Sequence, residues 1–272
     1  MPYYLKENKI ELLKNGKDYF ASVIESIKQA QQSIFVETYI FSHDVTGIKI
    51  LTALKEAARR NIDVYLLLDG FGSRDLSQKV IDEIKSSKIH FLFYHPKISP
   101  YQMKRISLRR LHRKMFLIDH KIAYVGGINI IDDSNVPNGK APRIDYAAQL
   151  KGPVVSSISQ SMVKLWKRVS WSHLEKSYIP KHIKKNIALY PNGTKLSFIE
   201  RDNFRHRQDI EKAYLDAIQN AKHEILIANA YFIPGKKFER ALIDASRRGV
   251  SVTLLLKGEM DYFLSNATRA FY

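Results

Sequence analysis

The chain has 272 residues, of which 45% are hydrophobic and 26% charged, so it is a globular protein long enough to bury a large core. Its 44 Lys and Arg residues outnumber 27 Asp and Glu residues, and the resulting net charge of +17 favours polyanionic partners such as nucleic acid or anionic lipid. The absence of cysteine excludes disulfides and thiolate metal sites.

The N-terminal sequence, MPYYLKENKIELLKNG, has no apolar stretch behind a basic start, so we expect no signal peptide. The most apolar runs, IFVETYIF and VYLLL, are far shorter than the roughly 18 residues that a membrane span requires. Any membrane contact is therefore expected to be peripheral.

The first elements alternate between amphipathic helix and apolar strand. Residues 22–41, SVIESIKQAQQSIFVETYIF, predict a helix, a polar turn and a strand, and residues 51–70, LTALKEAARRNIDVYLLLDG, predict the same order. Helices that alternate with fully apolar strands favour an α/β fold with a largely parallel sheet covered on both faces.

Residues 111–129, LHRKMFLIDHKIAYVGGIN, predict a β-hairpin in which HK is a possible tight turn between two apolar runs. Side chains of a strand alternate between its two faces. We therefore expect His112 and Lys114 on one face and Arg113 on the other.

This hairpin carries groups suited to phosphate chemistry. A neutral imidazole can attack phosphorus and carry a phosphoryl group covalently, while Lys114 and Asn129 would donate to its non-bridging oxygens. Gly126 and Gly127 remove side chains where another group approaches the backbone closely. No clustered carboxylates or histidine spacing suggest a metal, so we expect no metal or other cofactor.

Residues 152–171, GPVVSSISQSMVKLWKRVSW, predict a helix opened by Gly152-Pro153, with an apolar stripe that belongs to the core. Residues 176–193 are basic, interrupted by Pro and Gly, and lack periodicity, which suits a linker. Residues 1–175 are thus expected to form a first unit.

The remaining residues repeat the start of the chain. Residues 239–258, ERALIDASRRGVSVTLLLKG, align without gaps on residues 51–70, and residues 214–232 share the pattern of residues 22–41. Resemblance between any two helix–strand units is the alternative to true duplication. Residues 194–272 would then form a second, incomplete repeat, in which the counterpart of His112 would fall near position 300.

The spacing His112-x-Lys114-x4-Asp119-x6-Gly126-Gly127-x-Asn129 resembles the motif of the phospholipase D superfamily. The resemblance implies a duplicated α/β fold with a mixed, mostly parallel sheet flanked by helices, and an active site that takes one motif from each half. One histidine becomes phosphorylated, and the other protonates the leaving alcohol and then activates the incoming hydroxyl.

Carried over to this chain, the resemblance makes His112 the nucleophile or the general acid/base. Lys114, Asn129 and Gly127 are the phosphate-binding positions. Asp119 completes the catalytic motif, but its place at the hairpin turn suggests an architectural role.

The superfamily also has a downstream carboxylate that orients the histidine, and Asp145, in RIDYAAQLKGP, is the candidate for it. An isolated carboxylate that enters a core needs a partner. A salt bridge with Arg143 or a role in a turn is the alternative reading.

The stretches ETYIF, LLLDGFGS, NAYFIPG and LLLKGE follow one another as in bacterial cardiolipin synthases, and the type without N-terminal membrane helices is the most similar. This resemblance implies transfer of a phosphatidyl group between phospholipids, typically two phosphatidylglycerols giving cardiolipin and glycerol. It also implies a peripheral protein at the cytoplasmic side of the bacterial inner membrane.

Residues 97–114 carry seven Lys and Arg residues among apolar ones, a mixture suited to an anionic membrane surface, although such a run can also be a solvated face. A phosphodiesterase or nuclease is one alternative function, but the basic residues lack a regular aromatic platform. A non-catalytic remnant is another.

The chain carries only one of the two motifs that such an active site needs. The second could come from another copy of the chain, from a separate polypeptide, or from a longer reading frame, which we favour. An incomplete second repeat would expose apolar surface around LLLKG and NAYFI, so poor solubility of the isolated chain is expected.

Overall fold

The computed structural model describes residues 3–95, 110–136, 142–173, 187–200, 208–230 and 232–256. The chain divides into two compact units, the larger comprising Tyr4–Phe198 and the smaller beginning at Ile199.

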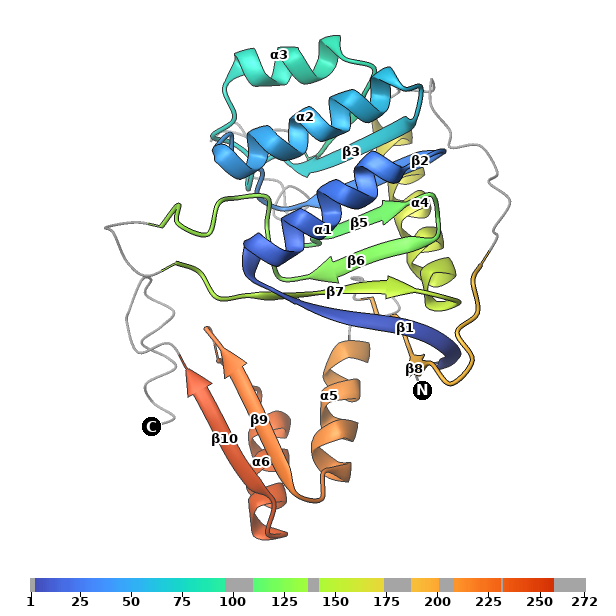
Figure 1. The fold of residues 1–272 in the computed structure, drawn as a ribbon. Helices are drawn as coiled ribbons and strands as arrows, with labels where there is room; N and C mark the ends of the chain where they lie inside the picture. Colours follow the sequence, from blue (N-terminus) through green and yellow to red (C-terminus); the bar gives the residue numbers. More distant parts are fainter. Residues whose placement is uncertain are drawn as a thin grey trace. The chain divides into compact units, whose positions relative to one another are not determined.

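The larger unit is built on an eight-stranded sheet with the strand order β4-β3-β2-β5-β6-β7-β1-β8 (Figure 1). Its strands are β1 (Leu5–Lys14), β2 (Ser33–Thr38), β3 (Asp63–Asp69), β4 (His90–Tyr94), β5 (Met115–Ile118), β6 (Ile122–Gly126), β7 (Tyr146–Lys151) and β8 (Thr194–Leu196).

The sheet is mixed, as expected, but it is not mostly parallel. Only β2, β3 and β4 run parallel to one another, whereas every other neighbouring pair is antiparallel. Helical crossovers impose parallel pairing on β2 to β4 alone. The hairpin β5–β6 and the addition of β7, β1 and β8 produce the antiparallel half.

Helices cover both faces of this sheet (Figure 1). One face carries α1 (Asn15–Gln29), α2 (Val45–Arg59) and α3 (Gln78–Ser86), and the other carries α4 (Val154–Ser172). Strand β2 faces both layers: Ile34 and Val36 pack in the first core cluster and Phe35 in the second. The two-sided burial explains why this strand is apolar without alternation.

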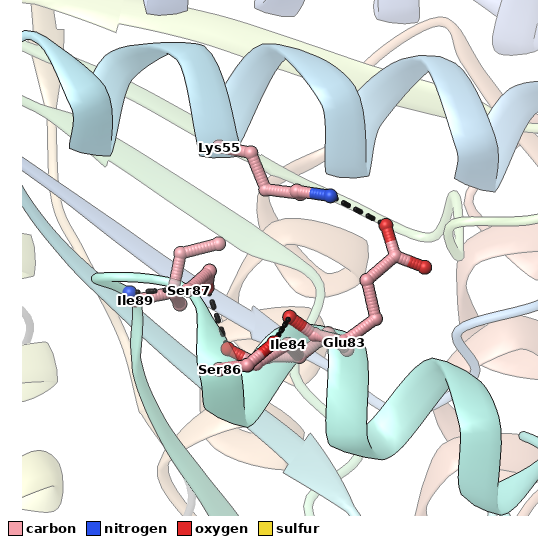
Figure 2. A network of polar contacts seen from close by, with 6 residues as sticks. All are labelled: Lys55, Glu83, Ile84, Ser86, Ser87 and Ile89. Carbon is pink, nitrogen blue, oxygen red and sulfur yellow. Dashed lines mark hydrogen bonds and ion pairs between the residues drawn. The ribbon is translucent and has the colours of Figure 1, made fainter.

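Two helices of the first layer begin at capping side chains. The carboxylate of Asp44 accepts a hydrogen bond from the N–H of Gly47 at 3.0 Å at the start of α2, and Ser77 caps α3. Figure 2 shows the ion pair between Lys55 of α2 and Glu83 of α3, whose Nζ and Oε1 atoms are 2.5 Å apart. Both side chains are partly exposed, so this pair contributes at most about 1 kcal/mol.

The helix α4 confirms the prediction for residues 152–171. It follows Gly152-Pro153, and its apolar stripe is buried in the second core cluster, including Ile158, Met162 and Trp166.

The smaller unit consists of α5 (Asp209–Asn220), β9 (Glu224–Asn229), α6 (Lys236–Arg247) and β10 (Ser251–Leu256), and its two strands pair in parallel. The order helix, strand, helix, strand is that of α1, β2, α2 and β3. One face of this sheet packs on the two helices, while Leu226 and Leu255 on the other face are 68% and 71% exposed. Leu255 agrees with the exposed apolar surface expected around LLLKG, whereas Phe232 of NAYFI is buried.

A repeated hydrogen bond strengthens the evidence for duplication. Arg60 donates through Nη2 to the carbonyl oxygen of Ile27 at 2.9 Å, and Arg248 donates through Nη2 to that of Ile218 at 3.0 Å. These arginines and isoleucines occupy matching positions in the two aligned repeats. The same side chain therefore closes the end of the preceding helix in both.

The smaller unit begins at Ile199, a few residues after the expected start of the second repeat at Thr194. Residues Thr194–Leu196 form β8, which pairs with β1, and the larger unit ends at Phe198. Of the expected linker, residues 176–186 lie outside the described residues, and Tyr190 donates its N–H to the carbonyl oxygen of Glu7 at 3.1 Å. Across the helices that the structure describes, none has the length and apolar character to cross a membrane.

Candidate active site

The motif residues gather at one edge of the larger sheet. Strand β2 ends at this edge and β5 begins there, because Glu37 pairs with Met115, and β6 ends beside the start of β7, because Gly126 pairs with Ala147. The segments that carry His112 and Lys114, Asn129, and Asp145 all adjoin these strand ends.

His112 and Lys114 lie just before β5, which begins at Met115, rather than within the strand. They nevertheless point the same way, as predicted. The centroid of the Tyr39 ring lies 5.1 Å from the centroid of the His112 ring and 5.3 Å from Lys114 Nζ. Arg113 points elsewhere: its Nη1 is 2.9 Å from Ser161 Oγ and 3.4 Å from Glu37 Oε2.

Lys114 is a buried amine, with 5% of its surface exposed, and its Nζ donates to the carbonyl oxygen of His112 at 3.2 Å. Burial lowers the pKa of Lys114 to about 8, and the negative charges of Asp145 and Asp69 oppose this shift. The ammonium ion therefore persists at neutral pH but is lost under mildly alkaline conditions.

The pKa of His112 is lowered from its usual value, first by desolvation and then by the charge of Lys114, while Asp69 opposes both. The imidazole is therefore neutral near pH 7. A neutral imidazole beside a buried cation is the arrangement that nucleophilic attack on a phosphate diester requires.

Asn129 is oriented by the backbone that follows β2. Its Oδ1 accepts a hydrogen bond from the N–H of Ile40 at 3.0 Å, so the amide oxygen faces the backbone next to Tyr39. This bond leaves the amide hydrogens of Asn129 as donors for a ligand, since they have no acceptor among the described residues.

The paired glycines permit a close approach, but protein groups fill the space. A Cβ on Gly126 would lie 2.5 Å from Ala147 Cα, and one on Gly127 would lie 2.4 Å from Asp145 Oδ1. The N–H of Gly127 donates to the carbonyl oxygen of Tyr146 at 3.0 Å, so this amide is already engaged. Gly127 thus makes room for Asp145, which revises its expected part as a phosphate donor.

Asp145 is half-buried, and its Oδ1 accepts a hydrogen bond from the N–H of Tyr146 at 2.7 Å. Its charge acts on Lys114. Among the described residues it has no hydrogen bond to His112, so its histidine-orienting role stays a prediction. Arg143 and Asp145, both described, form no salt bridge; Arg143 Nη1 donates to the carbonyl oxygen of Asp132 at 2.9 Å.

Asp119 lies at the opposite end of β5 from His112. Its carboxylate accepts hydrogen bonds from three successive backbone N–H groups, those of Gln31, Gln32 and Ser33, at 2.7–3.0 Å. The hairpin turn comprises Asp119 and His120, both with positive φ, one residue earlier than the expected HK turn. The geometry is that of an architectural residue.

Sequence reasoning missed Asp69 and Tyr39. Asp69 ends β3 with no exposed surface, and Tyr39 follows β2 directly. A carboxylate that closes an apolar strand, as in LLLDG, is the signal that could have identified Asp69.

The basic stretch at residues 97–114 falls largely on residues 96–109, which lie outside the described residues. Within the described ranges, His, Asp and Glu side chains form no group of three that could hold a metal ion.

Comparisons with known proteins agree with the motif. A family model described as "Cardiolipin synthase, PLD-like domain" matches residues 23–166 and 214–271. The chain is 40% identical over 254 residues to cardiolipin synthase B of Salmonella typhimurium and 37% identical to cardiolipin synthase B of Escherichia coli K12. Each match covers 93% of this chain, which spans 61% of the length of these relatives.

Among solved structures, phosphatidylserine synthase of Haemophilus influenzae superposes with a TM-score of 0.63 at 15% identity, over 93% of this chain and 63% of that one. This likeness shows the fold. The chain therefore belongs to the cardiolipin synthase family of phospholipase D-like proteins.

Proposed function

We propose that this site transfers a phosphatidyl group between phospholipids through a phosphohistidine formed at His112. The observation that carries the proposal is the neutral His112 imidazole beside the buried cation of Lys114. The similarity to cardiolipin synthases supports phosphatidylglycerol as donor and acceptor, with cardiolipin and glycerol as products.

In the first step an imidazole nitrogen of His112 attacks the phosphorus of one phosphatidylglycerol. The P–N bond forms, the P–O bond to the head-group glycerol breaks, and a general acid protonates the departing alkoxide. The Lys114 ammonium and the Asn129 amide donate to the non-bridging oxygens, where negative charge grows.

In the second step a head-group hydroxyl of another phosphatidylglycerol loses its proton to the same acid/base group and attacks the phosphorus. The P–N bond breaks and the imidazole is regenerated neutral. Residues 112–129 carry one copy of the motif, and a second copy of the chain, a separate polypeptide or a longer reading frame could each supply the acid/base histidine that the family resemblance implies.

We also propose that anionic phospholipids are the partners of this protein at a membrane surface. The net charge of +17 supports the proposal, and the basic and apolar composition of residues 97–114 points to the part of the chain involved. Contact of this kind would present head groups to the site without a membrane-spanning segment.

The test is the conversion of labelled phosphatidylglycerol in vesicles by wild-type protein and by His112→Asn. We expect cardiolipin and an acid-labile phosphate adduct on His112, both reduced about a thousandfold or more in the variant. His223→Asn, on the exposed surface of the smaller unit, is the matched control and should retain both.

Cardiolipin formation that persists in His112→Asn would overturn the proposal. Phosphatidate as the sole product would instead identify a phosphodiesterase, because water would have replaced the second lipid.

A further inference from the structure

Among the described residues, the backbone of the segment that carries the reactive groups makes few hydrogen bonds. Residues 110–114 precede β5 and form no strand, so no continuous ladder of hydrogen bonds fixes His112. On the C-terminal side, the carbonyl oxygen of Lys114 accepts from the N–H of Gly126 at 3.3 Å. On the N-terminal side, the buried Leu111 is the point of attachment.

The N–H of Leu111 donates to Oδ2 of Asp69 at 2.7 Å. The other oxygen of the same carboxylate, Oδ1, accepts from the N–H groups of Phe71 and Gly72 at 3.0 and 2.9 Å. Asp69 therefore ties the end of β3 and the loop after it to the residue that directly precedes His112.

We propose that Asp69 is a positioning residue of the active site, which anchors the His112 segment to the end of β3 through its hydrogen bond with Leu111. The inference deepens the proposed phosphatidyl transfer and rests on it for its biological meaning. The hydrogen bonds of Asp69, however, can be tested in the protein without substrate.

The choice of a carboxylate supports this role. A fully buried negative charge is costly unless hydrogen bonds and a nearby cation compensate it. Asp69 has three backbone N–H donors, and its charge acts on both Lys114 and His112. An amide at this position would place its NH₂ group against at least one of these N–H donors, so it would lose the Leu111 bond or the loop bonds.

The test measures the His112 ring by NMR in protein labelled at histidine and assigned with His112→Asn. Within the described part of the chain, the charged or titratable groups that act on or contact His112 and Lys114 are Asp69, Asp145 and Tyr39, and the two residues also act on each other. Because the charge of Asp69 raises the pKa of both, Asp69→Asn should lower the pKa of His112. The Leu111 amide should also exchange about tenfold faster or more.

Asp63 provides a matched control at the opposite end of the same strand, where burial lowers the pKa of His90 and the charge of Asp63 opposes this shift. Asp63→Asn should lower the pKa of His90 and leave that of His112 unchanged. Asp69→Glu keeps the charge but displaces the carboxylate. It should therefore speed Leu111 exchange and change the pKa of His112 less than Asp69→Asn does.

A folded Asp69→Asn protein in which both the His112 pKa and Leu111 protection equal those of wild type would overturn the proposal. If that variant does not fold, the wild-type protein decides, because unprotected exchange of the Leu111 amide would show that no anchor exists. These measurements need no lipid, so a failure of phosphatidyl transfer would leave them interpretable.

Discussion

Lys114 shows how a single buried charge sets the chemistry of this site. Burial disfavours its ammonium form, while the carboxylates of Asp145 and Asp69 and the ring of Tyr39 favour it. The balance leaves the pKa of Lys114 at about 8, so the side chain is mostly charged at neutral pH. Binding of a phosphate diester should depend on this cation.

The affinity of the site for a soluble phosphodiester such as glycerophosphoglycerol should fall as pH rises through the pKa of Lys114, about 8. Above it, deprotonation removes the cation, and affinity should decline about tenfold per pH unit. Calorimetric titration between about pH 7 and about pH 10 measures this. Lys114→Arg should abolish the decline, because arginine stays charged; an equal decline in that variant would assign it to another group.

Asp145→Asn should lower the pKa of Lys114, since the charge that raises it is removed, and should cut phosphatidyl transfer sharply. The fold should survive, because an amide oxygen can still accept from the N–H of Tyr146. The pH dependence of diester affinity and the transfer rate are the measurements. Asp18→Asn, on the exposed face of α1, is the matched control. Unchanged transfer in Asp145→Asn would remove this residue from the site.

At the scale of elements, the two ends of β5 in the hairpin β5–β6 have different roles, one in the active site and one in the fold. The end that adjoins His112 carries the chemistry, and the end at Asp119 joins the hairpin to the connection between α1 and β2. A motif that is continuous in sequence is therefore divided in space. Only its glycines, its asparagine and its His-x-Lys pair share an edge of the sheet.

Asp119→Ala should destabilise the larger unit by about 2 kcal/mol, because three backbone N–H groups lose their acceptor. Diester affinity should change little, since Asp119 lies at the far end of β5. Urea unfolding and calorimetry measure the two quantities. Asp75→Ala, whose side chain is 93% exposed, should stay within about 0.5 kcal/mol. Lost affinity at unchanged stability would make Asp119 part of the chemistry.

At the scale of the whole molecule, the excess of basic residues predicts attraction to anionic surfaces. Exposed charges act over about 10 Å at moderate ionic strength, so contact with an anionic bilayer should weaken as salt is added. The exposed leucines of β9 and β10 provide a separate, salt-independent tendency to associate.

Co-sedimentation with vesicles should show binding to bilayers that contain phosphatidylglycerol and little binding to phosphatidylcholine alone. Replacing Lys97, Lys104 and Arg105 with glutamine should weaken this binding, because the basic stretch before His112 is discharged. The same change at Lys222, Lys236 and Lys237 removes equal charge and should weaken it less. Equal binding to both kinds of vesicle would contradict anionic lipid recognition.

The sequence by itself predicted a phosphate site and the repeating elements. The spacing from His112 to Asn129 pointed to phosphate chemistry, and periodicity located helices and the repeated unit, because both signals are local to short stretches of chain. The equivalence of Arg60 and Arg248 was likewise predicted by the gapless alignment of the two repeats, and the structure shows that they make equivalent hydrogen bonds.

Only the tertiary structure decided the strand order, the burial of Lys114 and the part played by Asp69. Apolar periodicity does not encode which strands become neighbours, so the antiparallel pairs other than the predicted hairpin β5–β6 were missed. Asp69 and Leu111 are 42 residues apart, and their contact exists because β3 ends at the edge where β5 begins. The desolvation that tunes Lys114 and His112 likewise arises from several elements meeting at one place.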